Sequence, residues 1–505
     1  MGLGRSCTVS LLGVAGHVVD VEADIANGLP GMTVVGMGDT AVAQARDRIR
    51  AAVLNSGHTW PMQRVTVLLA PAGIHKRGAG FDLAMAAALL AASRAVPEAA
   101  VTRPVLIGEL GLDGSVRPVP GVLPCLLAAV AAGRSEAIVP EANLAEASLA
   151  RGMTVRGVRT LRDLVAHLRG DPGMLVRPGP ARPPAPDRVP DMADVLGQPE
   201  ARFALELAAA GGHHMAMIGP PGAGKTMLAS RLPGLLPALT EQQALAVTAI
   251  HSVAGTLDSE TPLITRAPFV DPHHSASLVA MIGGGSGEIR PGSISLAHLG
   301  VLFLDEAPEF KRTVLDALRQ PMESGSVLVL RAKHMARFPA RFQLVLAANP
   351  CPCAAARDID CTCPSGVRRR YLSRLSGPLM DRVDIRVDLP AVDLMALAGD
   401  AEPQERSTVI AERVAAARER AAFRWHEQGH ACNGEASSAD VRAVWNSEIP
   451  LSPLLERAMR LGRLTARGYD RVLRLALTAA DLAARGRPSE ADVATALALR
   501  CGEAA

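Results

Sequence analysis

The sequence predicts an α/β protein in three parts: an α/β domain, a second α/β domain built on a parallel sheet, and a helical domain. Three observations support this prediction. Residues 1–170 alternate β-like runs, such as 65–69, with Ala-rich helical runs, such as 82–92. Residues 219–226 read GPPGAGKT, which fits the G-x-x-x-x-G-K-S/T pattern of a phosphate-binding loop. Residues 300–306 read GVLFLDE, an apolar strand that ends in two carboxylates.

The composition is typical of a globular protein. A hydrophobic content of 49% with 20% charged residues provides enough apolar side chains for several domain cores. No apolar run approaches the roughly 18 residues of a membrane span, and no charged leader precedes a hydrophobic segment. We therefore expect a cytoplasmic protein with no membrane partner and with reduced thiols. The net charge of +3 says little about partners, so any contact with nucleic acid must depend on local basic patches.

The domain boundaries follow from shifts in composition and pattern. We expect a first α/β domain over 1–170, a Pro-rich linker over 171–190, the nucleotide-binding core over 191–390 and a helical lid over 391–505. The linker contains seven prolines in twenty residues, and proline favours extended chain because it cannot donate to a β-ladder. Within the first domain, the dipeptide Asp113-Gly114 predicts a hairpin.

The phosphate-binding loop has the expected flanks, a buried strand over 215–218 and a helix that begins directly after the loop. Its glycines let backbone N–H groups close around the phosphates. Lys225 is placed to neutralise the β- and γ-phosphates, and the Thr226 hydroxyl to join the shell of a Mg²⁺ ion. The predicted ATP-binding residues are Gly219, Pro220, Pro221, Gly222, Ala223, Gly224, Lys225 and Thr226, together with Asp305.

Two further strand ends are expected to complete this site. Asp305 is expected to hold Mg²⁺ together with Thr226, and Glu306 to polarise the attacking water as a general base. The apolar run 344–348 ends at Asn349, whose amide could orient the same water. Taken singly, the acids have an alternative interpretation as solvated side chains at a strand end, and Asn349 as ordinary turn chemistry.

Residues 1–170 resemble the Lon-protease-like domain found in magnesium-chelatase-like ATPases. The matching stretches are 76–83, 108–114, 121–124 and 138–141. The resemblance implies that Gly78 and Leu123 stand where Lon proteases have their Ser nucleophile and Lys base. No nucleophilic pair exists without a hydroxyl and an amine, so we expect an inactive domain with a scaffold or DNA-facing role. Lys76 and Arg77 are either phosphate contacts or residues of a solvated loop.

Three positions resemble functional residues of AAA+ ATPases. Asn349, with the two earlier motifs, resembles sensor 1. The stretch 379–384 resembles the one that carries the arginine finger, which stabilises charge on the nucleotide of a neighbouring subunit. That resemblance implies the role for Arg382, with Arg374 as the rival.

The stretch 464–471 resembles the start of a lid helix, which implies that Arg467 is sensor 2. Arg467, Arg471 and Arg474 follow one another at four- and three-residue steps and so share one helix face. The alternative is a solvated basic face.

Two insertions interrupt the core. The first, 269–277, contains adjacent histidines, His273 and His274, which on extended chain point in opposite directions and so do not suit a shared metal. The second, 331–342, mixes basic and aromatic residues, is expected to form a hairpin that reaches a central pore, and suits contact with single-stranded or duplex DNA. Its alternative is a surface hairpin with solvated arginines.

Four cysteines are clustered in the loop 351–363. Two C-x-C pairs separated by seven residues suit a closed structural Zn²⁺ site, although C-x-C is tighter than the usual C-x₂-C. Free thiols in an ordered loop, or redox pairing, are the alternatives. The candidate zinc ligands are Cys351, Cys353, Cys361 and Cys363.

Over nearly its whole length the chain resembles the YifB/ComM-type magnesium-chelatase-like AAA+ ATPases. The order of domains and the runs 350–353 and 376–379 carry this resemblance. It implies an ATPase that uses Mg²⁺, assembles as a homo-oligomer, specifically a hexameric ring, and works as a DNA helicase in branch migration, recombination or natural transformation. The alternatives are a chelatase-type ATPase that remodels a protein partner for metal insertion, and an ATP-dependent protease, against which Gly78 and Leu123 argue.

Overall fold

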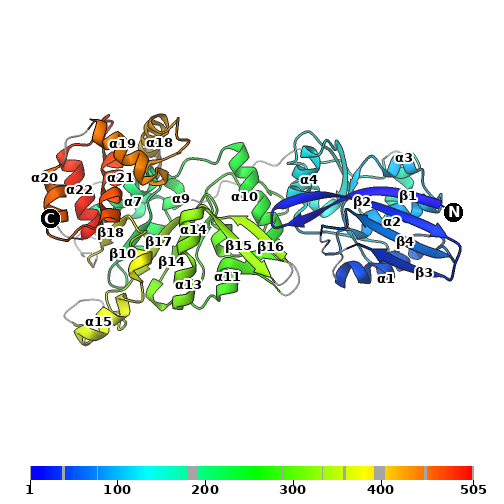
Figure 1. Ribbon diagram of the computed structural model, residues 1–505, viewed down its shortest axis with the longest axis horizontal. Helices are drawn as coiled ribbons and strands as arrows, with labels where there is room; N and C mark the ends of the chain where they lie inside the picture. Colours follow the sequence, from blue (N-terminus) through cyan, green and yellow to red (C-terminus); the bar gives the residue numbers. More distant parts are fainter. Residues whose placement is uncertain are drawn as a thin grey trace.

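The computed structural model shows an elongated molecule with its two termini at opposite ends (Figure 1). It describes residues 2–36, 40–74, 76, 78–171, 173–179, 190–285, 289–331, 334–355, 360–391, 404–448 and 452–502. The amino-terminal domain, the core with its parallel sheet and the carboxyl-terminal helices follow one another along the long axis. No helix among the described residues is long and apolar enough to cross a membrane.

The amino-terminal domain is built on a seven-stranded mixed sheet in the order β3-β4-β2-β1-β5-β8-β9. The strands are β1 (Gly2–Leu12), β2 (Ala15–Ala26), β3 (Gly31–Val35), β4 (Arg64–Ala70), β5 (Val105–Leu106), β8 (Glu136–Pro140) and β9 (Thr154–Val158). The Ala-rich helix α2 (Asp82–Ala92) is buried along its whole length and lies against β1. Gly4 permits this close approach, because a Cβ there would lie 2.2 Å from the Ala88 carbonyl oxygen.

Several smaller elements complete this domain, and they include the predicted hairpin. The strands β6 (Glu109–Leu110) and β7 (Val116–Arg117) pair antiparallel on either side of the Asp113-Gly114 turn. The helices are α1 (Thr40–Asn55), α3 (Glu98–Val101), α4 (Val122–Ala131), α5 (Leu144–Ala147) and α6 (Leu161–Leu168).

The boundary between the first domain and the linker lies later than the composition suggests. Leu175 is buried in the core of the first domain, and Val176 forms a β-bridge with Gly157. The chain after α6 therefore still belongs to the first domain as far as Val176. Most of the Pro-rich run, 180–189, lies outside the described residues.

The central domain contains a five-stranded parallel sheet in the order β11-β14-β17-β10-β18. Its strands are β10 (Met215–Ile218), β11 (Phe269–Val270), β14 (Val301–Leu304), β17 (Gln343–Ala348) and β18 (Ile385–Asp388). The flanking helices include α7 (Pro199–Gly211), α8 (Lys225–Ala229), α10 (Glu241–Ala254), α11 (Leu278–Ile282), α14 (Arg319–Ser324), α15 (Ser365–Leu372) and α16 (Gly377–Met380). The sheet confirms the predicted parallel α/β core.

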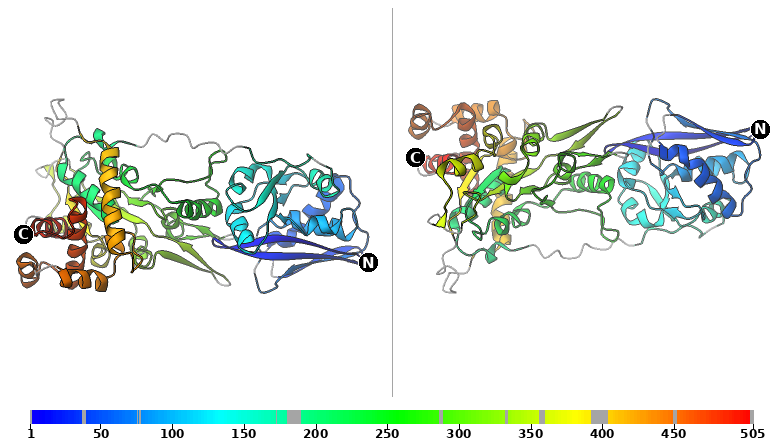
Figure 2. Two further views of the ribbon diagram at one scale, coloured as in Figure 1. Left: turned by 90° about the horizontal axis from the view of Figure 1, so that it is seen from above. Right: turned by 90° about the horizontal axis from the view of Figure 1, so that it is seen from below.

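The carboxyl-terminal part is helical, as predicted. Its helices are α18 (Ser407–Arg424), α19 (Ser438–Glu448), α20 (Pro453–Arg460), α21 (Ala466–Leu482) and α22 (Glu490–Cys501). They gather at the end of the central domain that faces away from the amino-terminal domain (Figure 2). Helices α18 and α21 both contact α7, so the helical part and the central domain share one apolar core.

The predicted hairpin is present as β15 (Ser326–Arg331) and β16 (His334–Pro339). The two aromatic residues of the segment 331–342 are not available for the predicted contact with DNA. Phe338 is fully buried and Phe342 is 8% exposed, because both belong to the apolar core beside the sheet. The exposed side chains of the hairpin include Leu330, Met335 and Arg337.

The amino-terminal domain contacts the central domain along a seam. At Gly13, the tip of the β1–β2 hairpin approaches β16 so closely that a Cβ would lie 2.8 Å from the Arg337 carbonyl oxygen. Nearby, Ser252 at the end of α10 donates a hydrogen bond to the buried Glu146 carboxylate, which also accepts one from the Leu123 backbone N–H at 2.8 Å. Burial raises the pKa of Glu146 above its ordinary value.

Lys76 differs from both interpretations of its sequence context. Its side chain is fully buried and its ammonium donates to the Pro71 carbonyl oxygen. The side chain is therefore neither a phosphate contact nor part of a solvated surface. Arg77, which has the same two interpretations in the sequence, lies outside the described residues.

Candidate active site

Three loops of the candidate active site leave the parallel sheet at one edge. Ile218 pairs with Ala348, and Leu304 pairs with Leu346, so β10, β14 and β17 end close together. The phosphate-binding loop follows β10, the two acids follow β14 and Asn349 follows β17. Open parallel sheets bind their ligands at this carboxyl edge, and the fold therefore brings together the phosphate-binding loop, the two acids and Asn349.

The conformation of the phosphate-binding loop explains its glycines. Gly222 and Gly224 have φ angles of 78° and 89°, in the left-handed region that residues with a Cβ rarely adopt. Gly219 is needed for a different reason: a Cβ there would lie 2.6 Å from the Leu389 carbonyl oxygen, next to β18. Helix α8 begins at Lys225 directly after the loop.

Lys225 lies at the centre of the loop. Its ammonium donates to the carbonyl oxygens of Gly219 at 2.6 Å and Pro220 at 2.8 Å, and to Asn349 Oδ1 at 3.0 Å. The residue is only 8% exposed, and this burial lowers the pKa of the ammonium. A phosphate oxygen would be a natural replacement for one of these neutral acceptors, because a charged acceptor forms the stronger bond.

Thr226 and Asp305 form a second contact between the loop and the β14 strand end. The Thr226 hydroxyl donates to Asp305 Oδ2 at 2.8 Å. A hydroxyl and a carboxylate are the oxygen ligands that Mg²⁺ takes beside a nucleotide. These two residues therefore fit a magnesium ion bridged to phosphates.

Glu306 has two features that its sequence context did not predict. Its φ angle is +49°, an unusual left-handed conformation for a residue with a side chain. Its carboxylate Oε2 lies 3.3 Å from Nδ1 of His274, which belongs to the segment after β11. The sequence analysis considered His274 only as a metal ligand and missed this contact, because the two-residue strand β11, which brings the histidine here, is too short to recognise from its pattern.

Arg382 lies away from this edge. The segment that carries Arg382 directly precedes β18, and the first residue of β18, Ile385, pairs with Met215 at the start of β10. Arg382 is thus at the amino edge of the sheet, where it donates to Glu323 and the Pro378 carbonyl oxygen. The length of β10, about 10 Å, separates that edge from the phosphate-binding loop. Arg374 instead donates to Glu309 at 3.0 Å.

The three arginines of α21 do not form one solvated face. Arg467 is exposed, whereas Arg471 donates to the buried Asp384 and Arg474 is largely buried, with the pKa of its guanidinium lowered by burial. Asp384 immediately precedes β18, so this helix face also lies at the amino edge of the sheet. Of the three arginines, only Arg467 is solvent-exposed, as expected for a solvated basic face.

The cysteine cluster forms as its spacing predicts. The Sγ atoms of the four cysteines all lie within 4.8 Å of one another, with Cys351 and Cys353 3.0 Å apart. The Cys363 backbone N–H lowers the pKa of Cys361 to about 6, which favours the thiolate. Four converging thiols on short loops are the donor set of a structural zinc site.

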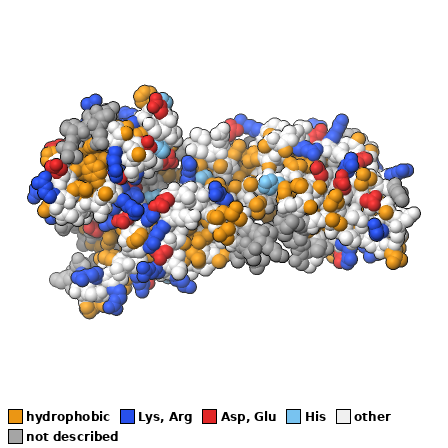
Figure 3. Space-filling view, in the orientation of Figure 1, with side chains coloured by type: hydrophobic (Ala, Val, Ile, Leu, Met, Phe, Trp, Pro, Cys, Tyr) orange, Lys and Arg blue, Asp and Glu red, His pale blue; other side chains and the backbone are white. Residues whose placement is uncertain are grey.

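The helix after this cluster projects from the body of the protein (Figure 1). This helix, α15, carries the exposed side chains of Arg369 and Arg370. Figure 3 shows Lys and Arg side chains gathered around the projection. It therefore presents a basic surface next to the candidate metal centre.

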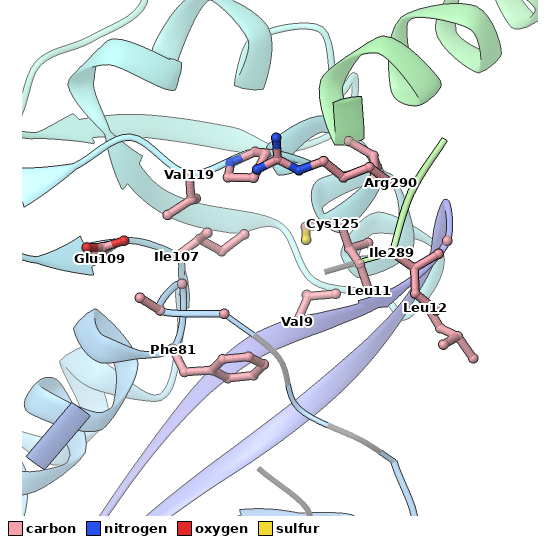
Figure 4. Close-up of a pocket in the computed structure, with 16 residues that line it drawn as sticks. Val9, Leu11, Leu12, Phe81, Ile107, Glu109, Val119, Cys125, Ile289 and Arg290 are labelled. Atoms are coloured by element: carbon pink, nitrogen blue, oxygen red, sulfur yellow. The ribbon is translucent and has the colours of Figure 1, made fainter. Parts of the chain in front are cut away.

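A cavity of about 140 Å³ occupies the seam and is lined by Gly78, which the resemblance to Lon proteases predicts to stand at the position of the peptidase serine. Its apolar wall includes Val9, Phe81 and Ile107, and Arg290 enters from the central domain (Figure 4). Among the described residues that line it there is no Ser, Thr or Lys. The lining thiol is Cys125, and burial raises its pKa, which disfavours the thiolate. The described lining therefore provides no Ser–Lys pair.

Three segments match family models. Residues 191–397 match the model described as magnesium chelatase, subunit ChlI, and residues 404–500 match magnesium chelatase, subunit ChlI C-terminal. Residues 21–143 match subunit ChlI of Mg-chelatase. Together the three models span most of the chain, from the amino-terminal domain to α22.

The sequence aligns with several proteins over nearly its whole length. An uncharacterized protein of Mycobacterium tuberculosis is 51% identical over 500 residues, 99% of both chains. Protein YifB of Escherichia coli is 41% identical over 482 residues, 95% of this chain and 94% of its own. Competence protein ComM of Haemophilus influenzae is 39% identical over 495 residues, 97% of this chain and 96% of its own. A shorter stretch of 138 residues, 26% of this chain, is 33% identical to 16% of a Lon protease of Trichlorobacter lovleyi.

Proposed function

Because the chain belongs to the magnesium-chelatase-like family of AAA+ ATPases that includes YifB and ComM, we propose that it is a ring-forming, ATP-driven DNA motor. We place its action in recombination or in the uptake of DNA during transformation. ATP and Mg²⁺ use follow from the family. The DNA substrate, the helicase activity and the hexameric ring are our proposal. The name of the relative ComM, a competence protein, supports the link to transformation.

We assign the residues of the carboxyl edge to the hydrolysis of ATP. Lys225 neutralises the β- and γ-phosphates, while the backbone of residues 219–224 wraps around them. Thr226 and Asp305 would hold Mg²⁺, which would supply positive charge beside the phosphates. Glu306 takes a proton from the attacking water, and Asn349 orients that water.

The placement of Arg382 and Arg467 supports assembly into a ring and is the observation on which the motor proposal depends. Arg382 lies at the edge of the sheet opposite to the phosphate-binding loop of its own chain. Arg467 is exposed one helical turn before Arg471, which bonds Asp384 at that same edge. A guanidinium there can stabilise a transferring phosphoryl group only on a neighbouring subunit. The nucleotide site is then complete only between two copies, with the loop and acids from one and the arginines from the next.

Two basic surfaces support contact with DNA. One is the projecting helix α15 with Arg369 and Arg370, and the other is the exposed Arg337 side chain on the β15–β16 hairpin. Because the aromatic residues of the hairpin are buried, we assign it to phosphate contact rather than to stacking on bases. Such contacts weaken as salt concentration rises.

We also propose that the four clustered cysteines hold one Zn²⁺ ion in a structural site. The support is the convergence of the four Sγ atoms. A metal there would fix the loop between Asn349 and α15, and so hold the basic helix in a set direction relative to the nucleotide site.

A comparison of Lys225→Ala with wild type tests the motor. We expect the variant to keep its fold and lose ATP turnover and unwinding of forked or four-way DNA by at least about 100-fold, because the lost charge serves the nucleotide. Lys311→Ala, which removes an exposed lysine at the start of another helix, is the matched control and should behave as wild type.

Two results would contradict the proposal. Normal ATP turnover by the Lys225 variant would show that the loop is not the nucleotide site. A wild-type ATPase that neither binds nor is stimulated by forked DNA in low salt would favour a chelatase-type remodeller of a protein partner instead.

A further inference from the structure

We propose that a polar pocket in the amino-terminal domain binds a small phosphate monoester that carries hydroxyl groups, such as a sugar phosphate. The pocket has a volume of about 210 Å³ and is formed by the ends of α3, α6, β8 and β9. None of its described lining residues lines the seam cavity or belongs to the phosphate-binding loop. The inference therefore does not depend on the proposed function.

The floor of the pocket is one face of the sheet at the amino ends of β8 and β9. These strands run parallel, with Glu136 opposite Thr154 and Ile138 opposite Arg156. Side chains alternate between the two faces of a strand, so these four side chains share one face. Ile138 is buried in the apolar core of the domain, whereas Glu136 and Thr154 are exposed. The pocket thus lies where this face of the sheet passes from the core to solvent.

Three side chains that carry N–H donors reach the pocket from different elements. Arg156 comes from β9, His167 from the last turn of α6, and Arg103 from the loop between α3 and β5. Burial lowers the pKa of His167, Arg156 lowers it further and Glu136 raises it, so these charges lie close around the imidazole. Within the described part of the chain, none of the three side chains forms a hydrogen bond or an ion pair. Their N–H groups are therefore available to a ligand.

This set of donors fits a phosphate group. A phosphate monoester presents three strong acceptor oxygens and up to two negative charges. The guanidinium groups of Arg103 and Arg156 can each give paired hydrogen bonds to such oxygens. The Thr154 hydroxyl and the His167 ring offer further donors from the neighbouring strand and helix ends. Donors that converge from three elements suit a compact tetrahedral anion better than a planar carboxylate.

Glu136 indicates the chemistry of the rest of the ligand. An ionised carboxylate only accepts hydrogen bonds and repels other anions, so in this pocket it fits the hydroxyl groups of an ester. The same carboxylate disfavours a nucleic-acid backbone, whose phosphates follow one another closely. The pocket is also far from the surfaces that we assign to DNA, since α3 lies on the side of its domain away from the central domain (Figure 1). We therefore assign the pocket to a small molecule.

Titration calorimetry of the full chain with ribose-5-phosphate tests the proposal. All proteins carry Lys225→Ala, which removes the charge for phosphate at the nucleotide site. We expect one saturable site per chain and no measurable binding of unphosphorylated ribose. Arg156→Ala and Arg103→Ala should each weaken binding by at least about 10-fold, because each removes hydrogen bonds to a charged group. Arg50→Ala, which removes an exposed arginine of α1 outside the pocket, is the control of equal charge and should bind as its parent does.

A second pair of titrations tests the role of Glu136. The parent should bind ribose-5-phosphate more tightly than inorganic phosphate, because only the ester has hydroxyl groups for the carboxylate to accept. Glu136→Ala should lose this preference. It should bind inorganic phosphate at least as well as the parent, since it removes a repelling charge. Circular dichroism of each variant checks that the fold is unchanged.

Several results would overturn the inference. They are no saturable binding of ribose-5-phosphate, equal binding of ribose, unchanged affinity in both pocket arginine variants, an equal loss in Arg50→Ala, and a preference that survives in Glu136→Ala. Displacement of the sugar phosphate by a short duplex DNA, with weaker binding of that DNA by Arg156→Ala, would assign the pocket to the DNA backbone instead. None of these results depends on ATP turnover, so failure here is distinct from failure of the proposed motor.

Discussion

At the scale of single residues, the buried carboxylate of Asp384 shows how charge is stabilised away from water. Burial alone would raise its pKa, but the Arg471 guanidinium and His213 outweigh burial and hold the pKa of Asp384 well below its ordinary value. A depressed pKa means that the folded state binds the proton less readily than the unfolded state. The pair therefore stabilises the fold above the ordinary carboxyl pKa, and this stability is lost as pH falls through the folded pKa.

We therefore expect Asp384→Asn to lower the free energy of unfolding at pH 7 by about 3 to 5 kcal/mol, since it leaves Arg471 buried without its partner charge. The difference from wild type should stay constant between pH 7 and 5 and shrink below about pH 4, where wild type also begins to lose the pair. Urea unfolding followed by Trp fluorescence at these pH values measures it. The exposed Asp47→Asn is the control, and equal stability of Asp384→Asn and wild type at pH 7 would contradict the argument.

Single residues also mark the limit of what the sequence can predict. The residues of the phosphate-binding loop, Asp305 and Asn349 could be placed at one sheet edge because each follows an apolar strand. The burial of Lys76 and Phe338 could not be predicted, because hydrophobic pattern alone does not say which basic or aromatic side chain turns inward. The contact between His274 and Glu306 depends on a pairing of two very short segments, which leaves no periodic signal.

At the scale of elements, the cysteine loop has the clearest testable property. We expect wild type to purify with close to one zinc ion per chain, and Cys353→Ser and Cys361→Ser to lose it, because a closed site needs all four thiolates. Elemental analysis measures the content, and the absorption of Co²⁺ bound in place of zinc reports thiolate ligation. Cys501→Ser, outside the cluster, should keep the metal. Four reactive thiols with no bound metal would show a thiol loop instead.

Helices with a long periodic pattern were easier to predict than the boundary between domains. The helical run predicted over 82–92 is α2, with the same bounds, and α21 begins within the stretch 464–471. The hairpin predicted within 331–342 begins earlier, at Ser326. The end of the first domain was predicted too early, because two apolar residues after α6 return to its sheet through a single bridge to Gly157. A pairing this short leaves no recognisable pattern in a proline-rich stretch.

At the scale of the whole molecule, the seam around Glu146 joins the first domain to the ATPase. We expect Glu146→Ala to loosen it, because the Ser252 hydroxyl and the Leu123 N–H each lose a buried acceptor. Faster hydrogen exchange in α4 and α10, with little change in the parallel sheet, is the readout. Glu146→Gln keeps an acceptor and removes a charge that burial disfavours, so exchange should stay as in wild type. Unchanged exchange in the alanine variant would show that the domains do not depend on this contact.

The position of Arg382, one strand length away from the phosphate-binding loop of the same chain, has a consequence for how the protein would be controlled in the cell. If catalysis requires a guanidinium lent by a neighbour, an isolated copy is a latent enzyme. ATP turnover per chain would then rise steeply with the concentration of the protein, because higher concentration favours assembly. Dilution would lower turnover without any inhibitor.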